Sequence, residues 1–178
     1  MALTFSKMVP LGLSAPDFNL KGIDDCFHSL SSYDCAKVLV IIFMCNHCPY
    51  VQKIWPALIS LKKELPAEVE FIGINSNANP AYTEDSFEKM KEYAAERGQN
   101  FPYLFDEDQK TAKAYNAVCT PDIFVFDRGR GGSNSGSRTL KYRGAFEGLK
   151  SAVTALLKGE EPPEDQTHSM GCSIKWTA

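Results

Sequence analysis

The sequence predicts an α/β domain whose mixed central sheet is covered by helices on both faces. Apolar runs rich in β-branched residues alternate with segments whose apolar residues recur every three or four positions, which indicates strands alternating with helices. Two further strands then follow one another before a last helix, which indicates an antiparallel hairpin beside a parallel core.

The first half of the chain is expected to begin with a β-hairpin and to continue as strand, helix and strand. Turn signals surround short alternating stretches in the N-terminal hairpin region, and the continuous apolar run after it is typical of a strand covered on both faces. Helical spacing of apolar residues follows, and Pro66 closes that stretch. The expected elements are a hairpin within 1–36, the central strand at 37–43, a helix over 51–65 and a second buried strand at 70–75.

The second half is expected to contain two helices around short strands, then a hairpin and a last helix. Thr83 is interpreted as the N-cap of a helix that ends at Gly98. The glycine- and serine-rich segment 128–138 favours a mobile hairpin loop over an anion site formed by its arginines, Arg128, Arg130 and Arg138. The other expected elements are a strand at 103–105, a helix near 107–116, strands at 122–127 and 139–143, and a helix at 146–158.

Length and composition indicate one domain that needs no disulfide to hold its core. The chain has 178 residues, 44% of them hydrophobic, and a net charge of −3. We expect residues 1–160 to form the domain and 161–178 to form a C-terminal tail that packs on it. The acidic balance argues against nucleic acid as a partner, and the longest apolar run is too short to cross a membrane. We read no export signal at the N-terminus and expect a reducing, cytoplasmic location.

Two of the six cysteines form a local motif, Cys45-Asn-His-Cys48, at the junction of the central strand and the helix after it. Unpaired backbone N–H groups and the helix dipole stabilise an anion there, so the pKa of Cys45 is expected to be lowered, which makes this sulfur the attacking thiolate. Cys48 is then placed to resolve the mixed disulfide. His47 adds a donor or positive charge near Cys45 and predicts a more oxidising couple. The same spacing also suits half of a zinc site, completed by Cys119, Cys172 or a histidine.

Four segments resemble the thioredoxin superfamily, specifically its alkyl hydroperoxide reductase and thiol-specific antioxidant branch. They are the stretches 15–20 (APDFNL), 43–51 (FMCNHCPYV), 119–127 (CTPDIFVFD) and the ending 171–176 (GCSIKW), which is similar to that of a peroxiredoxin-like subgroup. The resemblance implies a thioredoxin-like three-layer α/β/α sandwich with an added N-terminal β-hairpin.

The resemblance also implies roles for residues far from the motif. It implies a cis peptide bond between Thr120 and Pro121, and a backbone before that proline that faces the two cysteines and pairs with an extended substrate strand. Cys119 would then lie close to Cys45, as a third redox thiol, a metal ligand or simply a small buried residue. Cys172 is a possible auxiliary thiol in the tail. Cys26 and Cys35, in the hairpin region, are interpreted as structural.

The sequence also departs from both kinds of relative. Peroxiredoxins have a threonine three residues before the reactive cysteine, whereas here Ile42 and Cys45 stand at those places. Thioredoxins have a buried aspartate six residues before the first cysteine, where this chain has Leu39. His47, another acidic group or water must therefore assist Cys48.

The sequence therefore predicts a thiol–disulfide oxidoreductase that needs no dissociable cofactor and no metal. Its expected partners are protein or low-molecular-weight disulfides and thiols, together with an unidentified reductant. The first alternative is a thiol peroxidase that reduces hydroperoxides. The second is a metal-binding or redox-inert interaction module on the same fold.

Overall fold

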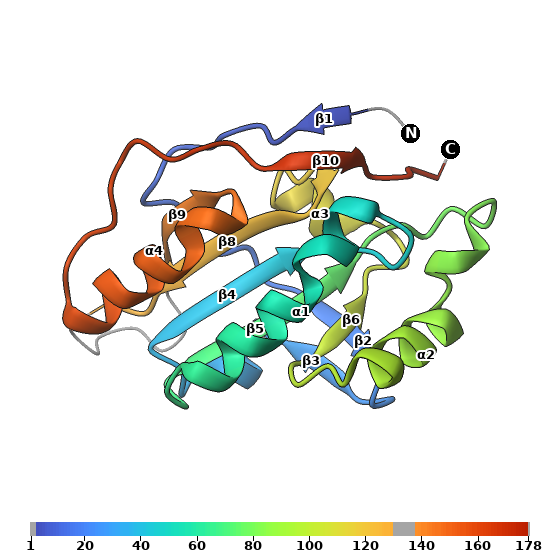
Figure 1. Cartoon of the computed structure of the whole chain (residues 1–178), viewed down its shortest axis with the longest axis horizontal. Helices are drawn as coiled ribbons and strands as arrows, with labels where there is room; N and C mark the ends of the chain where they lie inside the picture. Colours follow the sequence, from blue (N-terminus) through green and yellow to red (C-terminus); the bar gives the residue numbers. More distant parts are fainter. Residues whose placement is uncertain (1–2, 130–137, 178) are drawn as a thin grey trace.

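The computed structural model describes residues 3–129 and 138–177 as three layers, with a sheet between two layers of helices and turns (Figure 1). The predicted mixed sheet is confirmed: seven strands lie in the order β3-β2-β6-β5-β4-β8-β9. The strands of this sheet are β2 (Asn19–Gly22), β3 (Phe27–Ser29), β4 (Val38–Phe43), β5 (Val69–Asn75), β6 (Tyr103–Phe105), β8 (Asp122–Asp127) and β9 (Thr139–Gly144).

Strand β4 is central because both of its faces consist of apolar side chains. All six residues are fully buried. Val38, Val40 and Ile42 pack with the helices of one face, whereas the alternate residues, Leu39, Ile41 and Phe43, pack with the segments of the other face. Because β4 runs parallel to β5 and antiparallel to β8, the carboxyl ends of β4 and β5 meet at one edge of the sheet.

Helices α1 (Pro49–Glu64), α2 (Phe87–Arg97) and α4 (Phe146–Lys158) contribute to one apolar cluster, and α3 (Lys110–Ala114) with the 3₁₀ turn η1 (Leu30–Tyr33) contributes to the other. In α1, Val51, Trp55 and Leu58 are fully buried, as the helical spacing predicts. No helix in the described part of the chain is long and apolar enough to cross a membrane.

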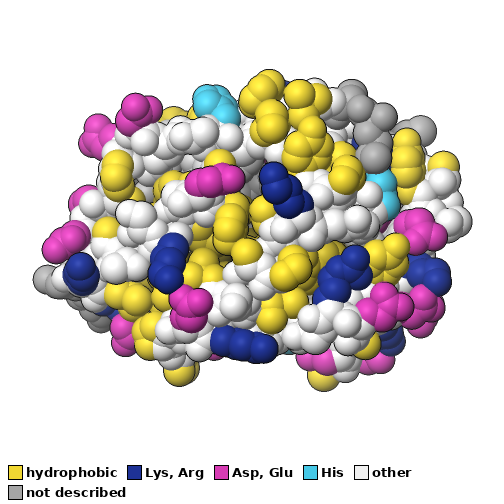
Figure 2. Space-filling view, in the orientation of Figure 1, with side chains coloured by type: hydrophobic (Ala, Val, Ile, Leu, Met, Phe, Trp, Pro, Cys, Tyr) yellow, Lys and Arg dark blue, Asp and Glu magenta, His cyan; other side chains and the backbone are white. Residues whose placement is uncertain are grey.

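A second, three-stranded sheet brings together the two ends of the chain and the segment before Pro121. It has the order β1-β10-β7, formed by β1 (Leu3–Phe5), β10 (Met170–Ser173) and β7 (Cys119–Thr120), and all of its pairs are antiparallel. Figure 1 shows β1 and β10 side by side along one edge of the molecule. In Figure 2 a group of apolar side chains lies over these strands, where Leu3, Phe5 and Met170 are exposed.

The structure corrects two helix boundaries. Thr83 does not cap α2: Thr83–Asp85 is a separate 3₁₀ turn, η2, and the Ser86 side chain accepts the backbone N–H of Lys89 at the start of α2. Gly98 ends α2 in the left-handed conformation, as predicted. The helix expected near 107–116 is limited to α3, because the buried Asp106 carboxylate accepts the backbone N–H groups of its first turn.

The predicted hairpins are confirmed, but Arg138, which was expected in the loop of the second hairpin, is buried. Strand β2 pairs with β3, and β8 pairs with β9. Arg138, placed in the mobile loop by the sequence, is buried and donates to the carbonyl oxygens of Tyr33 and Ala36, so it holds η1 against β9. Arg130 and the rest of 130–137 lie outside the described residues, so the predicted loop is not tested there.

Candidate active site

The two cysteines of the motif lie where β4 ends and α1 begins. Cys45 is in the loop after β4, Cys48 is the N-cap residue of α1, and Pro49 occupies the first helical position, where the missing N–H removes no hydrogen bond. Both sulfur-bearing side chains are fully buried. The junction therefore holds the two thiols in the interior, beneath other parts of the chain.

Strand β7 supplies the residue that touches both thiols. The peptide bond between Thr120 and Pro121 is cis, as expected. The Thr120 hydroxyl lies 3.4 Å from the sulfur of Cys45, and the thiol of Cys48 donates to the Thr120 carbonyl oxygen at 3.1 Å. The Cys119 thiol lies 3.9 Å from the carbonyl oxygen of Pro121, and burial raises its pKa; its expected proximity to Cys45 stays a prediction. Within β7, Thr120 is thus the residue that hydrogen-bonds to both motif cysteines.

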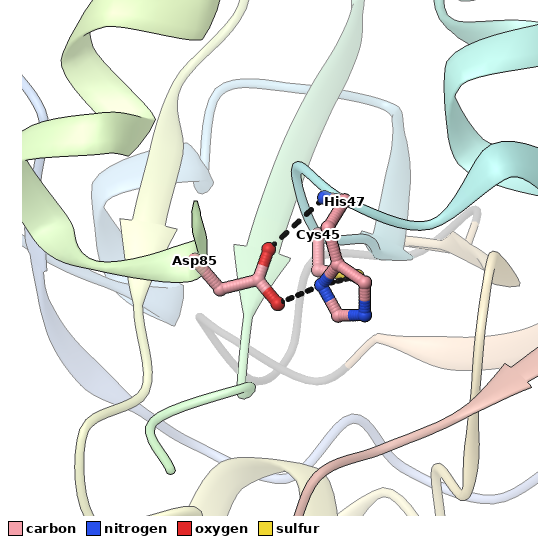
Figure 3. A group of neighbouring side chains, drawn as sticks. All are labelled: Cys45, His47 and Asp85. Atoms are coloured by element: carbon pink, nitrogen blue, oxygen red, sulfur yellow. Dashed lines mark hydrogen bonds and ion pairs between the residues drawn. The ribbon is translucent and has the colours of Figure 1, made fainter. Parts of the chain in front are cut away.

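A buried carboxylate stands on the other side of the motif. Asp85, in η2, is fully buried, and Figure 3 shows it pointing toward the loop that bears Cys45 and His47. One oxygen accepts the backbone N–H groups of Asn46 at 2.8 Å and His47 at 3.1 Å. The other accepts the side-chain amide of Asn77 at 2.9 Å and forms a short contact with Nδ1 of His47.

The contact with Asp85 orients the His47 ring and favours its protonated form. It raises the pKa of His47, which burial opposes. The same ring atom, Nδ1, lies 4.0 Å from the Cys45 sulfur, so one nitrogen faces both the thiol and the carboxylate. A relay of the catalytic-triad type uses the two ring nitrogens for two different partners. His47 is therefore a neighbour of Cys45 whose protonated form is favoured by Asp85, and not the middle member of such a triad.

The pKa values of the two motif cysteines are split in the direction opposite to the one expected from the sequence. Burial raises the pKa of Cys45, and both its hydrogen bond to Cys48 and the negative charge of Asp85 raise it further. The hydrogen bond from Cys45 lowers the pKa of Cys48, and the Cys172 thiol and the backbone N–H of Val51 lower it further against the effect of burial. The contact with Cys45 is the largest of the effects that lower the pKa of Cys48.

The C-terminal tail brings a third thiol into the site. Strand β10 pairs with β7 so that Cys172 lies opposite Thr120 and Ser173 lies opposite Cys119. The thiol of Cys172 is hydrogen-bonded to Cys48, and burial raises the pKa of Cys172. By contrast, Cys26 and Cys35 are exposed.

Comparison with known proteins identifies the family. The profile of the AhpC/TSA family matches residues 11–130. The chain belongs to the AhpC/TSA family. A search of curated proteins gave no match.

Solved structures confirm the thioredoxin-like fold of this AhpC/TSA chain. An uncharacterized conserved protein from Geobacillus kaustophilus is 41% identical, with a TM-score of 0.91 over 99% of this chain and 97% of its own. A hypothetical protein from Sinorhizobium meliloti 1021 is 34% identical, with a TM-score of 0.91 over 98% of this chain and 99% of its own. The peroxidoxin BcpB from Mycobacterium tuberculosis is 20% identical, with a TM-score of 0.65 over 85% of this chain and 98% of its own, a likeness that shows the fold alone.

One group of side chains in this AhpC/TSA protein has the composition of a metal site. The ligand atoms of Cys45, His47 and Asp85 all lie within 4.8 Å of one another. The zinc site considered from the sequence used Cys45 and Cys48 with Cys119, Cys172 or a histidine, so this set shares Cys45 and a histidine with it but includes Asp85 in place of Cys48. Each oxygen of Asp85 already has two hydrogen-bond partners, which satisfies the acceptor capacity of a carboxylate. The carboxylate of Asp85 is thus fully used within this network, whereas the buried Nε2 of His47 has no hydrogen-bond partner among the described residues.

Sequence reasoning missed Asp85 and Asn77, which complete this site. The sequence placed Asp85 within the helix expected to begin at Thr83 and gave it no role. A usable signal was the polar run Asn75-Ser76-Asn77, directly after the apolar strand β5. Because β5 is parallel to β4, that run had to lie beside the residues that follow β4, which include the cysteine motif.

Proposed function

We propose that this AhpC/TSA protein is a thiol–disulfide oxidoreductase in which Cys48 and Cys45 cycle between a dithiol and a disulfide. The observation that supports it is the pair of buried thiols at the N-terminus of α1, which both contact Thr120 and shift each other's pKa in opposite directions. A low-pKa thiolate next to a thiol that keeps its proton is the arrangement that two-step disulfide exchange requires.

In the first step the Cys48 thiolate attacks one sulfur of a substrate disulfide. The substrate's second sulfur leaves as a thiolate, and a mixed disulfide joins Cys48 to the substrate. The Cys45 proton passes to the substrate thiolate released in the first step, and the Cys45 sulfur attacks Cys48. The Cys45–Cys48 bond forms and the substrate's first sulfur leaves as a thiolate, so the substrate gains two electrons and the protein loses two.

The neighbouring residues have distinct roles in this scheme. Thr120 orients both sulfurs through its hydroxyl and carbonyl oxygen, and Pro121 shapes the backbone on which an extended substrate segment would pair. His47 and Asp85 are titratable neighbours of Cys45, with their ligand atoms within 4.8 Å of its sulfur. The proposed substrates are protein or low-molecular-weight disulfides and thiols.

The test is to equilibrate the protein in glutathione buffers of graded potential, alkylate the remaining thiols, and measure intact mass and peptide maps. We expect a reversible loss of two hydrogens and a mapped Cys45–Cys48 disulfide. The midpoint potential of this titration shows whether the Cys45–Cys48 couple is reducing or oxidising relative to glutathione. Cys48→Ser should abolish the disulfide, whereas Cys35→Ser, which removes an exposed cysteine, should titrate like the unaltered chain. A native mass that includes a metal ion, together with no pair of thiols that can be oxidised reversibly, would contradict the proposal.

A thiol peroxidase is the second candidate because a hydroxyl does stand beside the thiols, although β7 supplies it and not the motif. The Thr120 side chain is hydrogen-bonded to Cys45 and also lowers the pKa of Cys48. In this reaction Cys48 attacks a peroxide oxygen, the O–O bond breaks with release of an alcohol, and Cys45 condenses with the sulfenic acid to expel water. Stopped-flow measurement of the oxidation rate decides the matter: a rate equal to that of cysteine in solution rejects the peroxidase.

A further inference from the structure

Strand β10 occupies the edge on which the proposed substrate segment would pair. It pairs antiparallel with β7, directly before Pro121, with Cys172 opposite Thr120. Cys45 and Cys48 have no exposed surface while this strand is in place. The chain therefore fills its own substrate edge with a segment that includes a cysteine.

The tail approaches this edge so closely that one of its residues must be glycine. A Cβ atom on Gly171 would lie 1.9 Å from the carbonyl oxygen of Thr120 and 2.8 Å from its carbonyl carbon, both of which are backbone atoms. The same carbonyl oxygen accepts the thiol of Cys48. Gly171 and Cys48 thus both contact the carbonyl oxygen of Thr120. This shared contact places the next residue, Cys172, beside Cys48.

Hydrogen bonds hold the rest of the tail and connect it to the buried carboxylate. The backbone N–H of Lys175 donates to the side-chain oxygen of Asn77 at 2.9 Å, and the amide of the same Asn77 donates to Asp85. Gln109 donates to the carbonyl oxygen of Lys175 at 2.9 Å, and its own side-chain oxygen accepts from Thr177. The tail is therefore docked against the network of the active site and not merely against the outside of the domain.

We propose that Cys172 is a second disulfide partner of Cys48, so that oxidation can join strand β10 to the N-terminus of α1. This inference rests on the proposed function, because it needs Cys48 to undergo disulfide exchange. Cys48 is the common member of both pairs, since its thiol contacts the carbonyl oxygen of Thr120, opposite which Cys172 lies, and Cys45, Cys48 and Cys172 belong to one buried cluster.

The exchange needs no reagent beyond those of the proposed function. Starting from the Cys45–Cys48 disulfide, the Cys172 thiol loses its proton and its sulfur attacks Cys48. The Cys48–Cys172 bond forms, the Cys45–Cys48 bond breaks, and Cys45 leaves as a thiolate that takes up the proton. No electrons are gained or lost in this step. One oxidised form ties the tail across the substrate edge, and the other leaves β10 attached by hydrogen bonds alone.

The test separates the two pairs by removing one partner at a time. Cys45→Ser, Cys172→Ser and the control Cys35→Ser are each oxidised with glutathione disulfide, alkylated, digested without reduction and mapped by mass. In Cys45→Ser, Cys48 attacks glutathione disulfide and releases one glutathione, and Cys172 then displaces the second. We expect a linked pair of peptides containing residues 48 and 172 in that variant, a Cys45–Cys48 link in Cys172→Ser, and both links in the control.

The remaining outcomes overturn one claim or the other. If Cys45→Ser keeps glutathione on Cys48 while Cys172→Ser forms its link, Cys172 is not a partner and the proposed function still stands. If Cys45→Ser stays fully reduced, Cys48 is not the attacking thiol, and absence of the 48–172 link from the oxidised digest of the unaltered protein rejects the proposal. If no variant and no unaltered protein forms any disulfide, the proposed function itself fails. Should Cys45→Ser not fold, as judged by circular dichroism, the unaltered protein decides: absence of the 48–172 link from its oxidised digest rejects the proposal.

Discussion

The two sheets of this protein are stabilised in different ways. The seven-stranded sheet is stabilised by apolar packing on both faces, and its central strand β4 has no exposed residue. The three-stranded sheet is formed by short strands from distant parts of the chain, it exposes Leu3, Phe5 and Met170, and the tail beyond it is anchored by polar side chains. The difference indicates that the large sheet provides stability, whereas the small sheet controls access to the thiols placed between them.

The largest expected effect is a loss of stability when the core of the large sheet is altered. Phe71 in β5 is fully buried and packs edge-to-face on Phe101, with ring centroids 5.9 Å apart. Phe71→Ala should lower the free energy of unfolding by about 3–5 kcal/mol, measured by urea denaturation, because it removes apolar contacts and leaves a cavity. The matched control is Phe27→Ala in β3, whose side chain is exposed and should change stability by less than ~0.5 kcal/mol. Equal losses in the two variants would contradict the comparison.

In the small sheet, Gly171→Ala should change thiol access more than stability. The added methyl group would overlap the Thr120 carbonyl, so β10 must shift away from β7 at a cost of about 1–3 kcal/mol. We expect faster alkylation of Cys48 in the native protein, followed by mass mapping, than in Met170→Ala, which alters an exposed side chain of the same strand. An unchanged alkylation rate would mean that β10 does not control access to the site.

Asp85→Asn tests the network that joins both sheets to the motif. The pKa of His47 in the folded protein is raised by Asp85, so this pair stabilises the fold fully at pH values below the unfolded pKa of about 6.5. That stabilisation is lost as the pH rises through the higher, folded pKa. Asn at position 85 should return the His47 titration, followed by NMR, to lower pH and remove this dependence.

The control for that variant is Glu84→Gln. Glu84 is the neighbouring carboxylate, but its side chain accepts the hydroxyl of Tyr93 and does not face His47. The His47 titration should be the same in Glu84→Gln as in the unaltered protein. If both variants shift it equally, the effect belongs to general charge and not to the contact with Asp85.

The smallest effect is expected for the cysteines that lie outside the site. Cys26 and Cys35 are exposed, so replacing both by serine should change the free energy of unfolding by less than ~0.5 kcal/mol and leave the glutathione titration unaltered. A shifted midpoint would show that the thiol chemistry extends beyond the four buried cysteines.

Patterns within a few residues predicted most of the large sheet. The apolar run 37–43 and the spacing of Val51, Trp55 and Leu58 identified β4 and α1 with little error, because burial on two faces or on one helical face leaves a local period. The helix caps were less predictable. Thr83 and Ser86 are both good N-cap residues, and tertiary contacts of η2 decided between them.

The site was predictable only in part, because its remaining members come from distant segments. The cysteine motif and Thr120–Pro121 were found from the sequence, the latter through a family resemblance. Asp85 and the pairing of β10 with β7 depend on contacts between residues about 39 and 52 positions apart in the chain, for which no local period exists. From the motif alone the sequence placed the lowered pKa on Cys45, whereas the contacts with Cys45 and Cys172 lower the pKa of Cys48.

The position of β10 also affects how the protein is made. Chain synthesis proceeds from the N-terminus, and domains can begin to fold before synthesis ends. Every strand of the large sheet, α1 and β7 precede β10 in the chain. A nascent chain can therefore assemble the two thiols at the end of β4 before the strand that covers them has been translated. Premature termination before residue 170 would yield a domain whose reactive sulfurs lack their cover.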